Sequence, residues 1–262
     1  MNKKKSKKIL AIDCGGTFIK TALIDQKGLI TDRMSIETDA KKGKENFIQS
    51  FEKIIKKQYK KIEAVGIAFA GMLNSKKGII EEPPNFPKFC YNLPLVKILK
   101  ERCNIPIYME NDANLAALGE YWQGLKDKPE ILVVMTLGTG VGGGIIINGK
   151  IWNGASGIAG EIGHIRLDEK GPKAYGKQGS FEAFCSGSGI TKWAKQLIAE
   201  GLKSGEQFEF CKNENELENI TTKLLAQEAH KGNKIAIDLF KKSAQYLGKG
   251  LSILIDTLNP EA

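Results

Sequence analysis

The chain has 262 residues, 42% of them hydrophobic, which suits one large domain or two small ones with a sizeable core. No run reaches the roughly 18–20 apolar residues of a transmembrane helix, and the basic N-terminus shows no cleavage site of a signal peptide. The net charge is +9, but five lysines fall within residues 3–8, and the 34 basic residues elsewhere face 30 acidic ones. For this short tail, a solvated, frayed end is favoured over contact with nucleic acid or an anionic surface.

The five cysteines are scattered along the chain: Cys14, Cys90, Cys103, Cys185 and Cys211. They form no CxC or CxxC pair, and their number is odd. Reduced thiols in a cytoplasmic protein are therefore expected.

The first predicted element is a β-hairpin at residues 9–24, ILAIDCGGTFIKTALI. The residues after Gly16 are β-branched and aromatic, without an N-cap or helical spacing, so the glycines are expected to join two antiparallel strands. Residues 131–147, ILVVMTLGTGVGGGIII, repeat the pattern of apolar strand, Gly/Thr turn and apolar strand. The two hairpins suggest two halves built on one plan.

Between the hairpins, strands and helices alternate. A helix is predicted over Glu45–Tyr59, where Phe47, Phe51, Ile54 and Ile55 share one face. The elements expected after it are a buried strand at Ala64–Gly71, a proline-rich loop at Pro83–Pro94, a helix at Leu95–Arg102, a strand at Ile105–Met109 and a helix at Asp112–Gly124.

A domain boundary is placed near Asn114–Gly124, and Asn114 or Asp112 is expected near the cap of that helix. After the second hairpin comes a polar, glycine-rich section at Gly149–Gly189. The rest is predicted to be helical, at Ile190–Lys203, Glu216–Lys231 and Lys234–Leu258.

The glycine turns are candidate phosphate sites, because backbone N–H groups in such turns form nests for anions. One such turn is weak support, since tight turns use glycine for geometry alone; two facing turns would clamp a polyphosphate. Asp13 can hold Mg²⁺, directly or through water. Thr17 offers a hydroxyl, and Lys20 a positive charge, although an exposed strand lysine is the simpler interpretation of Lys20.

Residues 110–114, ENDAN, follow directly on a predicted strand. Ligand-binding residues of α/β folds often lie at such strand ends, where a carboxylate can accept a proton from a hydroxyl. Asp112 as a general base and Asp112 as a simple helix cap are about equally favoured by spacing.

Residues 160–164, GEIGH, form the third candidate site. A lone histidine more often has a structural role than a functional one. Here, however, Glu161 lies three residues before His164, and the motif contains two glycines, which favours a polar pocket. Glu182 is a weaker candidate, because a glutamate at the start of a helix is commonly just exposed.

Together the four motifs DCGGTFIK, ENDANLAALGE, TLGTGVGGGIIINGK and GEIGH resemble the ROK family of sugar kinases and repressors, over residues 9–260. This family belongs to the hexokinase/actin-like ATPase superfamily. The resemblance implies an α/β, two-lobed ribonuclease H-like fold with mixed sheets flanked by helices, with lobes at 1–115 and 116–262. It also implies a glucokinase-like reaction of carbohydrate metabolism and glycolysis, in which ATP with Mg²⁺ phosphorylates a hexose hydroxyl.

The resemblance also assigns site residues. Those of the first phosphate motif are Asp13, Gly15, Gly16 and Thr17. Those of the second are Thr136, Gly138, Thr139 and Gly140. Asp112 matches the catalytic base, and the positions that hold sugar hydroxyls are Asn85, Asn111, Asp112, Glu161, His164 and Glu182. Carboxylates and amides suit a sugar, whose hydroxyls both donate and accept.

Two departures from the family pattern stand out. Many members bind a structural zinc with the GH histidine and a CxCGxxGC run, but the three cysteine positions here hold Lys173, Tyr175 and Ser180. One histidine cannot complete a four-ligand site, so no zinc is expected. The family also continues beyond the equivalent of Ala262 into a glycine-containing adenosine motif, so the C-terminal lobe is expected to be incomplete on the adenine side.

Alternatives to an ATP-dependent kinase are a non-catalytic, sugar-binding remnant of a kinase and a polyphosphate-dependent glucokinase. A DNA-binding repressor is disfavoured, because the residues before Asp13 leave no room for a helix-turn-helix. The expected partners are a hexose and ATP, with no nucleic acid and no membrane, and the resemblance leaves a homodimer open. The identity of the hexose is not predicted; glucose, fructose, N-acetylglucosamine and N-acetylmannosamine all have relatives in the family.

Overall fold

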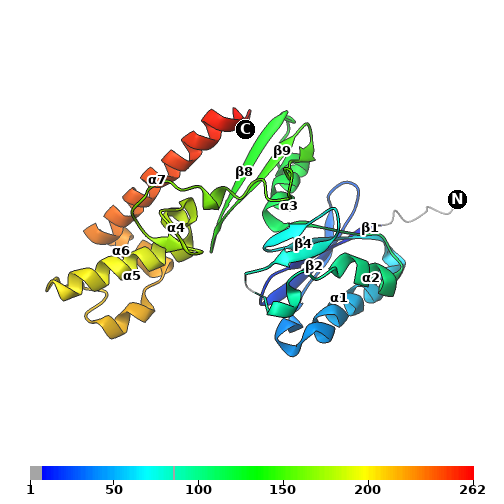
Figure 1. The fold of residues 1–262 in the computed structure, drawn as a ribbon, viewed down its shortest axis with the longest axis horizontal. Coiled ribbons are helices and arrows are strands. Elements are labelled where there is room, and N and C mark those ends of the chain that lie inside the picture. The colour runs from blue at the N-terminus through cyan, green and yellow to red at the C-terminus, as the bar shows by residue number, and fades with distance from the viewer. Residues whose placement is uncertain (1–7, 85) are drawn as a thin grey trace. The chain divides into compact units, whose positions relative to one another are not determined.

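The computed structural model describes residues 8–84 and 86–262, and the chain divides into two compact units (Figure 1). Unit 1 comprises Met1–Lys128 and Gly144–Ala159, and unit 2 comprises Pro129–Gly143 and Gly160–Ala262. The chain thus passes between the units three times. The functional lobes expected at 1–115 and 116–262 stay a prediction, and the lysine-rich tail at residues 1–7 lies outside the described residues.

A five-stranded mixed sheet forms the centre of unit 1. In spatial order its strands are β3 (Ile30–Glu37), β2 (Phe18–Ile24), β1 (Lys8–Cys14), β4 (Ile62–Phe69) and β7 (Ile107–Asn111). Strands β1, β2 and β3 pair antiparallel, whereas β1, β4 and β7 run parallel. The carboxyl ends of the three parallel strands therefore lie at one edge of the sheet, which is where ligands bind in such folds.

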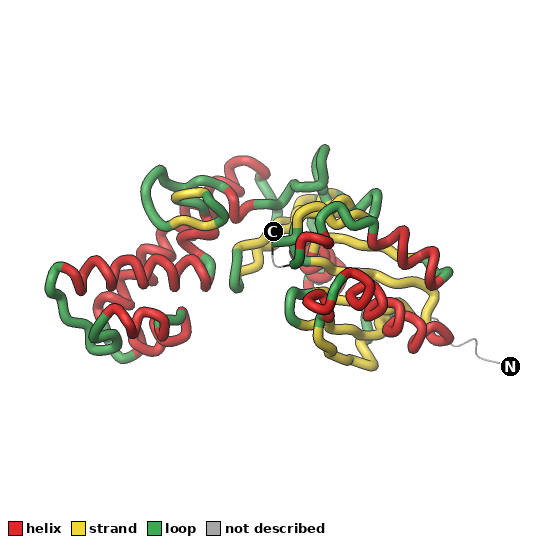
Figure 2. Tube along the Cα trace, turned by 60° about the horizontal axis from the view of Figure 1, so that its bottom comes forward, coloured by secondary structure: helices red, strands yellow, loops and turns green. Residues whose placement is uncertain are grey.

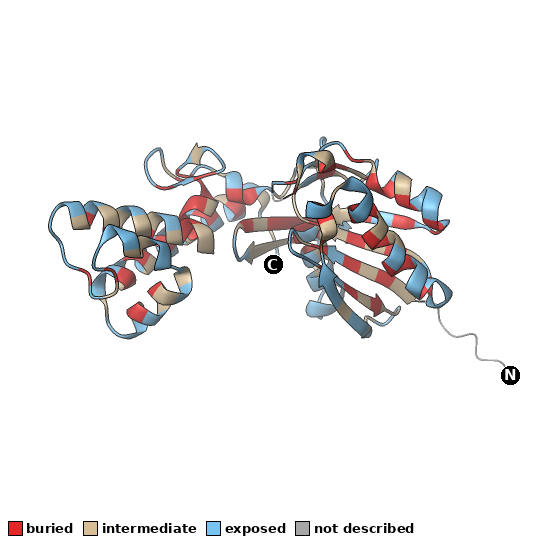
Figure 3. Ribbon diagram, turned by 90° about the horizontal axis from the view of Figure 1, so that it is seen from below, coloured by how far each residue is buried: buried red, intermediate tan, exposed pale blue. Residues whose placement is uncertain are grey.

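The first predicted hairpin is confirmed, since β1 and β2 pair from Ile9 opposite Ile24 to Cys14 opposite Ile19. Burial alternates along β1 and β4, as expected for strands with one face against the core (Figure 3). A small hairpin of β5 (Met72–Asn74) and β6 (Ile79–Glu82) follows β4. Figure 2 shows the strands of the structure in yellow and its helices in red.

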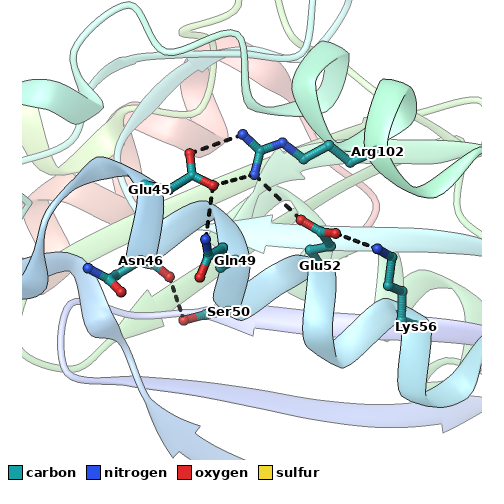
Figure 4. Close-up of polar contacts among 7 residues, drawn as sticks. All are labelled: Glu45, Asn46, Gln49, Ser50, Glu52, Lys56 and Arg102. Atoms are coloured by element: carbon teal, nitrogen blue, oxygen red, sulfur yellow. Dashed lines mark hydrogen bonds and ion pairs between the residues drawn. The ribbon is translucent and has the colours of Figure 1, made fainter.

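Helices α1 (Lys44–Gln58) and α2 (Leu95–Cys103) confirm the two helices predicted for this part of the chain. They pack against each other (Figure 1). The four apolar residues predicted to share a face of α1 are all buried. On the outer side, Arg102 of α2 binds Glu45 of α1 through both terminal nitrogens, at 2.6 and 3.0 Å, and Glu52 at 3.5 Å (Figure 4). These exposed ion pairs orient the two helices more than they stabilise the unit.

Unit 2 begins with the second predicted hairpin, β8 (Ile131–Leu137) and β9 (Val141–Ile147), which are hydrogen-bonded neighbours joined by three residues. From Gly144 onward β9 belongs to unit 1, as does β10 (Lys150–Ile151). The remaining elements of unit 2 are a 3₁₀ turn at Ile162–His164, β11 (Lys173–Ala174), β12 (Lys177–Gln178), α4 (Phe181–Cys185), α5 (Gly187–Lys203), a 3₁₀ turn at Glu214–Asn219, α6 (Thr222–His230) and α7 (Lys234–Leu258).

Two helix predictions need correction. The helix expected over Glu216–Lys231 begins only at Thr222, because Thr221 caps it by accepting a hydrogen bond from Leu224 N at 3.1 Å. The helix expected over Asp112–Gly124 ends as α3 (Asp112–Gly119) and continues as a π-helical turn at Glu120–Gly124. The helix expected over Lys234–Leu258 is confirmed to the residue.

All five cysteines are free and buried, as expected for reduced thiols. Burial raises the pKa of Cys90 and of Cys185 to about 11, so both stay protonated at neutral pH. Within residues 8–84 and 86–262, every helix is too short or too polar to span a lipid bilayer.

Candidate active site

The first glycine turn presents two opposite charges side by side. Asp13 lies near the end of β1 and is directly opposite Lys20 on β2, so both side chains lie on the same face of the sheet. Asp13, Thr17 and Lys20 are all exposed. The turn therefore offers a carboxylate, a hydroxyl and an ammonium group to solvent at the carboxyl edge of the sheet.

Thr38, the residue directly after β3, anchors this turn. Its hydroxyl donates to the carbonyl oxygen of Gly15 at 2.8 Å, and its N–H donates to the carbonyl oxygen of Thr17 at 2.9 Å. The Gly15 N–H donates to the carbonyl oxygen of Phe18 at 3.0 Å, which closes the turn. Thr38 gives no signal in the sequence beyond being a threonine after a strand.

The cap of α3 decides how Asp112 is used. Asn111, the last residue of β7, is the N-cap, and its side-chain oxygen accepts from the N–H groups of Ala113 and Asn114 at 2.9 and 3.1 Å. Asp112 and Asn114 therefore lie near the cap, as expected, but the N-cap residue itself is Asn111. Asp112 becomes the first helical residue, and capping does not explain its presence.

The carboxyl group of Asp112 is held where ionisation is costly. Its pKa is raised, mainly because surrounding protein removes water from the carboxyl group, although the residue as a whole still reaches solvent. The negative charge of Asp13 raises it further, and a hydrogen bond from Ala113 N at 2.9 Å opposes the shift. A carboxylate with a raised pKa is a stronger proton acceptor, which is the property of a general base.

A closed network of polar side chains holds the start of α3. Glu110 accepts from the side-chain amide of Asn114 at 3.1 Å and from that of Asn153 at 3.0 Å, and the Asn114 amide also donates to Asn153 at 3.1 Å. Because the carboxylate can only accept, it fixes the orientation of both amides. Asn153 was not predicted as part of the site, because it lies 39 residues from Asn114 in the chain.

Asn111, predicted to hold a sugar hydroxyl, uses both ends of its amide within the protein, since its nitrogen donates to the carbonyl oxygen of Gly71 at 3.3 Å. Its contact with a sugar stays a prediction. Asn85 lies outside the described residues.

The second glycine turn, Gly138–Gly140, lies in unit 2 against the start of α5. The carbonyl oxygen of Gly138 accepts from Gly187 N at 2.9 Å, and that of Thr139 accepts from the Ser188 hydroxyl at 2.6 Å. Gly138 and Thr139 are exposed, and Thr136 is half-buried.

Beside this turn is an open cavity of about 510 Å³ in unit 2. Its lining combines backbone, hydroxyl and ammonium groups from the turn, from α5 and from the start of α6: Gly138, Thr139, Gly187, Ser188, Thr191, Lys192, Lys195, Thr221 and Thr222. Such a lining suits a ligand that carries phosphate. A second cavity, of about 400 Å³, is lined by residues of α5, α7 and the segment between α5 and α6, and by no predicted site residue.

The third predicted group gathers on another part of unit 2. His164 Nε2 lies 3.8 Å from a Glu161 carboxylate oxygen, and the His164 ring centroid is 5.8 Å from that of Tyr175. Burial raises the pKa of Tyr175, and the negative charges of Glu182 and Glu161 add to the shift. In the sequence, Tyr175 stands at a position where the family pattern has a cysteine. In the structure it belongs to this group, and it has a left-handed φ of 45°.

The loop expected to lack zinc is held by other interactions. Lys173 and Gln178 pair across a small hairpin, and Ser180 caps α4 by accepting from Ala183 N at 3.2 Å. Lys177 donates to the carbonyl oxygen of His164. Within the described residues, no group of three or more His, Cys, Asp or Glu side chains could hold a metal ion.

Comparison with known proteins gives consistent matches. The model of the ROK family matches residues 9–262. The glucokinase of Halalkalibacterium halodurans is 33% identical over 261 residues, covering 96% of this chain and 77% of the relative. The N-acetylmannosamine kinase of Shigella flexneri is 36% identical over 192 residues, covering 73% and 65%. The solved structure of a ROK family glucokinase from Streptomyces griseus, in complex with glucose and AMPPNP, matches with a TM-score of 0.73 and 30% identity, covering 97% of this chain and 80% of that chain.

The structural match confirms the expected α/β fold of the ribonuclease H-like, actin-like ATPase class. The chain belongs to the ROK family. Within that family it is a carbohydrate kinase.

Proposed function

We propose that the chain transfers the γ-phosphate of ATP to a hydroxyl of a hexose, with Asp112 as the general base. The observation that carries this proposal is the state of Asp112. It follows a parallel strand at the carboxyl edge of the sheet, it is relieved of capping by Asn111, and its pKa is raised.

In the reaction, the sugar hydroxyl oxygen forms a bond to the γ-phosphorus while its proton moves to the Asp112 carboxylate. The bond from the γ-phosphorus to the bridging oxygen breaks, and ADP leaves with the electron pair. The network of Glu110, Asn114 and Asn153 keeps the first turn of α3 in place, so Asp112 is positioned before substrate arrives.

Each unit offers its own candidate residues for the phosphate donor. In unit 1, Asp13 offers the exposed carboxylate oxygens that Mg²⁺ prefers, next to the turn of Gly15, Gly16 and Thr17. In unit 2, the turn with Thr136, Gly138, Thr139 and Gly140 borders the cavity that contains Lys192. Mg²⁺, when bound, neutralises phosphate charge during the transfer.

The acceptor is a hexose or an N-acetylhexosamine. Glu161, His164 and Glu182 are clustered in unit 2 and offer the carboxylate and imidazole groups that bind hydroxyls. The named relatives act on glucose and on N-acetylmannosamine, so these two sugars are the first to test. Cytoplasmic location, a possible homodimer and the absence of zinc belong to the same proposal.

The test is ADP release from Mg-ATP by the 262-residue chain with glucose, N-acetylmannosamine, fructose and N-acetylglucosamine, with Asp112→Asn as the control. Sugar-dependent turnover that is lost in Asp112→Asn supports the proposal and names the acceptor. Folded protein that binds a sugar without turnover contradicts it and favours a sugar-binding role. Turnover with polyphosphate but not with ATP contradicts the proposed donor.

A further inference from the structure

Glu182 is set in a rigid part of unit 2. It is the second residue of α4, between Phe181 and Ala183, both of which have 0% exposure. Its neighbour Ser180, 2% exposed, caps the helix. The carboxylate of Glu182 therefore starts from a fixed backbone.

That carboxylate reaches the second glycine turn. Oε2 of Glu182 accepts a hydrogen bond from Val141 N at 2.9 Å, directly after the turn. A Cβ atom at position 140 would lie 2.6 Å from the same oxygen, so glycine at this position lets the carboxylate approach the backbone. A hydrogen bond to an ionised acceptor is about twice as strong as a neutral one, which makes this a firm attachment.

The negative charge of Glu182 also helps to raise the pKa of Tyr175, which lies beside His164 in the cluster that includes Glu161. The other attachments of the turn, Gly187 and Ser188, come from the start of α5, where the cavity lies. Of the three attachments, Glu182 is the one whose charge acts on the cluster of predicted sugar residues.

We propose that Glu182 is a positioning residue for the second phosphate turn: Oε2 fixes Val141 N–H while Oε1 accepts a sugar hydroxyl, so that one side chain couples the sugar and phosphate sites. This inference rests on the proposed function. The coupling is reciprocal, so sugar tightens the binding of the nucleotide as much as nucleotide tightens the binding of the sugar.

The test is binding of Mg-AMPPNP to the whole chain without sugar, for Glu182→Met and Glu182→Gln. Glutamine keeps a carbonyl oxygen for Val141 N–H, whereas methionine cannot accept the bond. Positioning predicts that Glu182→Met weakens nucleotide binding about tenfold, and that Glu182→Gln changes it less than about threefold. If Glu182 acted only through its charge, both variants would instead bind Mg-AMPPNP more tightly, because each removes a negative charge near the phosphates.

Glu161→Gln is the matched control, because Glu161 lies in the same cluster and is three residues from His164. We expect it to weaken sugar binding without changing nucleotide affinity in the absence of sugar. Equal effects of Glu182→Met and Glu161→Gln on nucleotide affinity would overturn the proposal.

Hydrogen exchange of the ligand-free chain tests the attachment independently of any kinase activity. Peptides that cover residues 137–143 exchange faster in Glu182→Met than in the parent chain, and Glu182→Gln restores the slower rate. Unchanged exchange in Glu182→Met overturns the positioning role. If hydrogen exchange changes as expected but the parent chain binds no nucleotide, the attachment through Glu182 holds and the proposed function is what fails.

Discussion

The turn after β1 is anchored by one residue, Thr38, whereas the turn after β8 is anchored by Glu182, Gly187 and Ser188 from two helices. The first turn carries its own charges on the flanking strands, Asp13 and Lys20. The second turn has no charged residue within Thr136–Gly140 and obtains its charges from elsewhere.

This difference separates the predicted roles of the two turns. The first turn places Asp13 close enough to Asp112 to raise its pKa, and these are the carboxylates for which we propose metal binding and proton transfer. The second turn, beside the lysines of α5, suits the remaining phosphates of the donor. Replacements near the first turn should therefore act on kcat, and replacements near the second on nucleotide KM.

The largest effect is expected for Asp112→Asn. Because a positioned general base contributes roughly 10²- to 10⁴-fold to a rate, kcat should fall by about that factor while sugar affinity is largely kept. Steady-state ADP release and sugar binding by calorimetry provide the two measurements. A mutant that keeps most of its activity would exclude Asp112 as the base.

The same replacement should not reduce stability, which separates a functional carboxylate from a structural one. The folded-state pKa of Asp112 is raised, so deprotonation costs the folded state free energy, and the cost is complete above that pKa. Removing the carboxylate removes the cost, and the thermal midpoint at pH 7 should equal or exceed that of the parent. A clear loss of stability would indicate that Asp112 holds α3 in place.

The pH dependence of turnover should show the same shift. Asp112 works as a base only when deprotonated, so kcat/KM should fall as the pH drops through its pKa, above the ordinary aspartate value of about 3.9. The measurement is kcat/KM from pH 4 to 8. Asp13→Asn should move the acidic limb to lower pH, because it removes the neighbouring negative charge.

Lys192 tests the second turn. It lines the cavity beside Gly138 and Thr139, so Lys192→Met should raise the KM for ATP about tenfold, a factor of the size expected for one charge near a phosphate, and leave kcat nearly unchanged. Lys203 is the control on the same helix, since it is not part of the lining of this cavity and lies 3.9 Å from Glu214. Equal effects of Lys192→Met and Lys203→Met would contradict a specific role for Lys192.

Much of this arrangement could be predicted from local sequence. Both hairpins, α1 with its buried face and α7 to its last residue followed from periodicity and turn residues, because these features depend on neighbours in the chain. The choice of Asn111 rather than Asp112 as the N-cap could not be predicted from the sequence. Asp and Asn are equally good caps, and the end of β7 decides between them.

The residues that hold the site in place could not be predicted from the sequence, for a different reason. Thr38 bonds to Gly15, which is 23 positions away, and Glu182 bonds to Val141, which is 41 positions away. Asn153 bonds to residues that are 39 and 43 positions away. No local pattern encodes such pairs. The motifs thus indicate candidate ligand-binding residues more readily than the residues that hold those candidates in place.

The smallest effect is expected for Thr38→Val, which concerns how the first turn is held. Thr38 is 7% exposed, and valine has the same shape without the hydroxyl that bonds to Gly15. Loss of a buried hydrogen bond costs about 1 kcal/mol of unfolding free energy, measurable by urea denaturation.

Thr21 of β2 is the matched control, because its buried hydroxyl has no hydrogen-bond partner among the described residues. Thr21→Val should therefore be neutral or stabilising, since it removes an unsatisfied polar group. If both variants lose the same free energy, the bond to Gly15 does not hold the turn, and the anchor must be the backbone contact between Thr38 N and Thr17 alone.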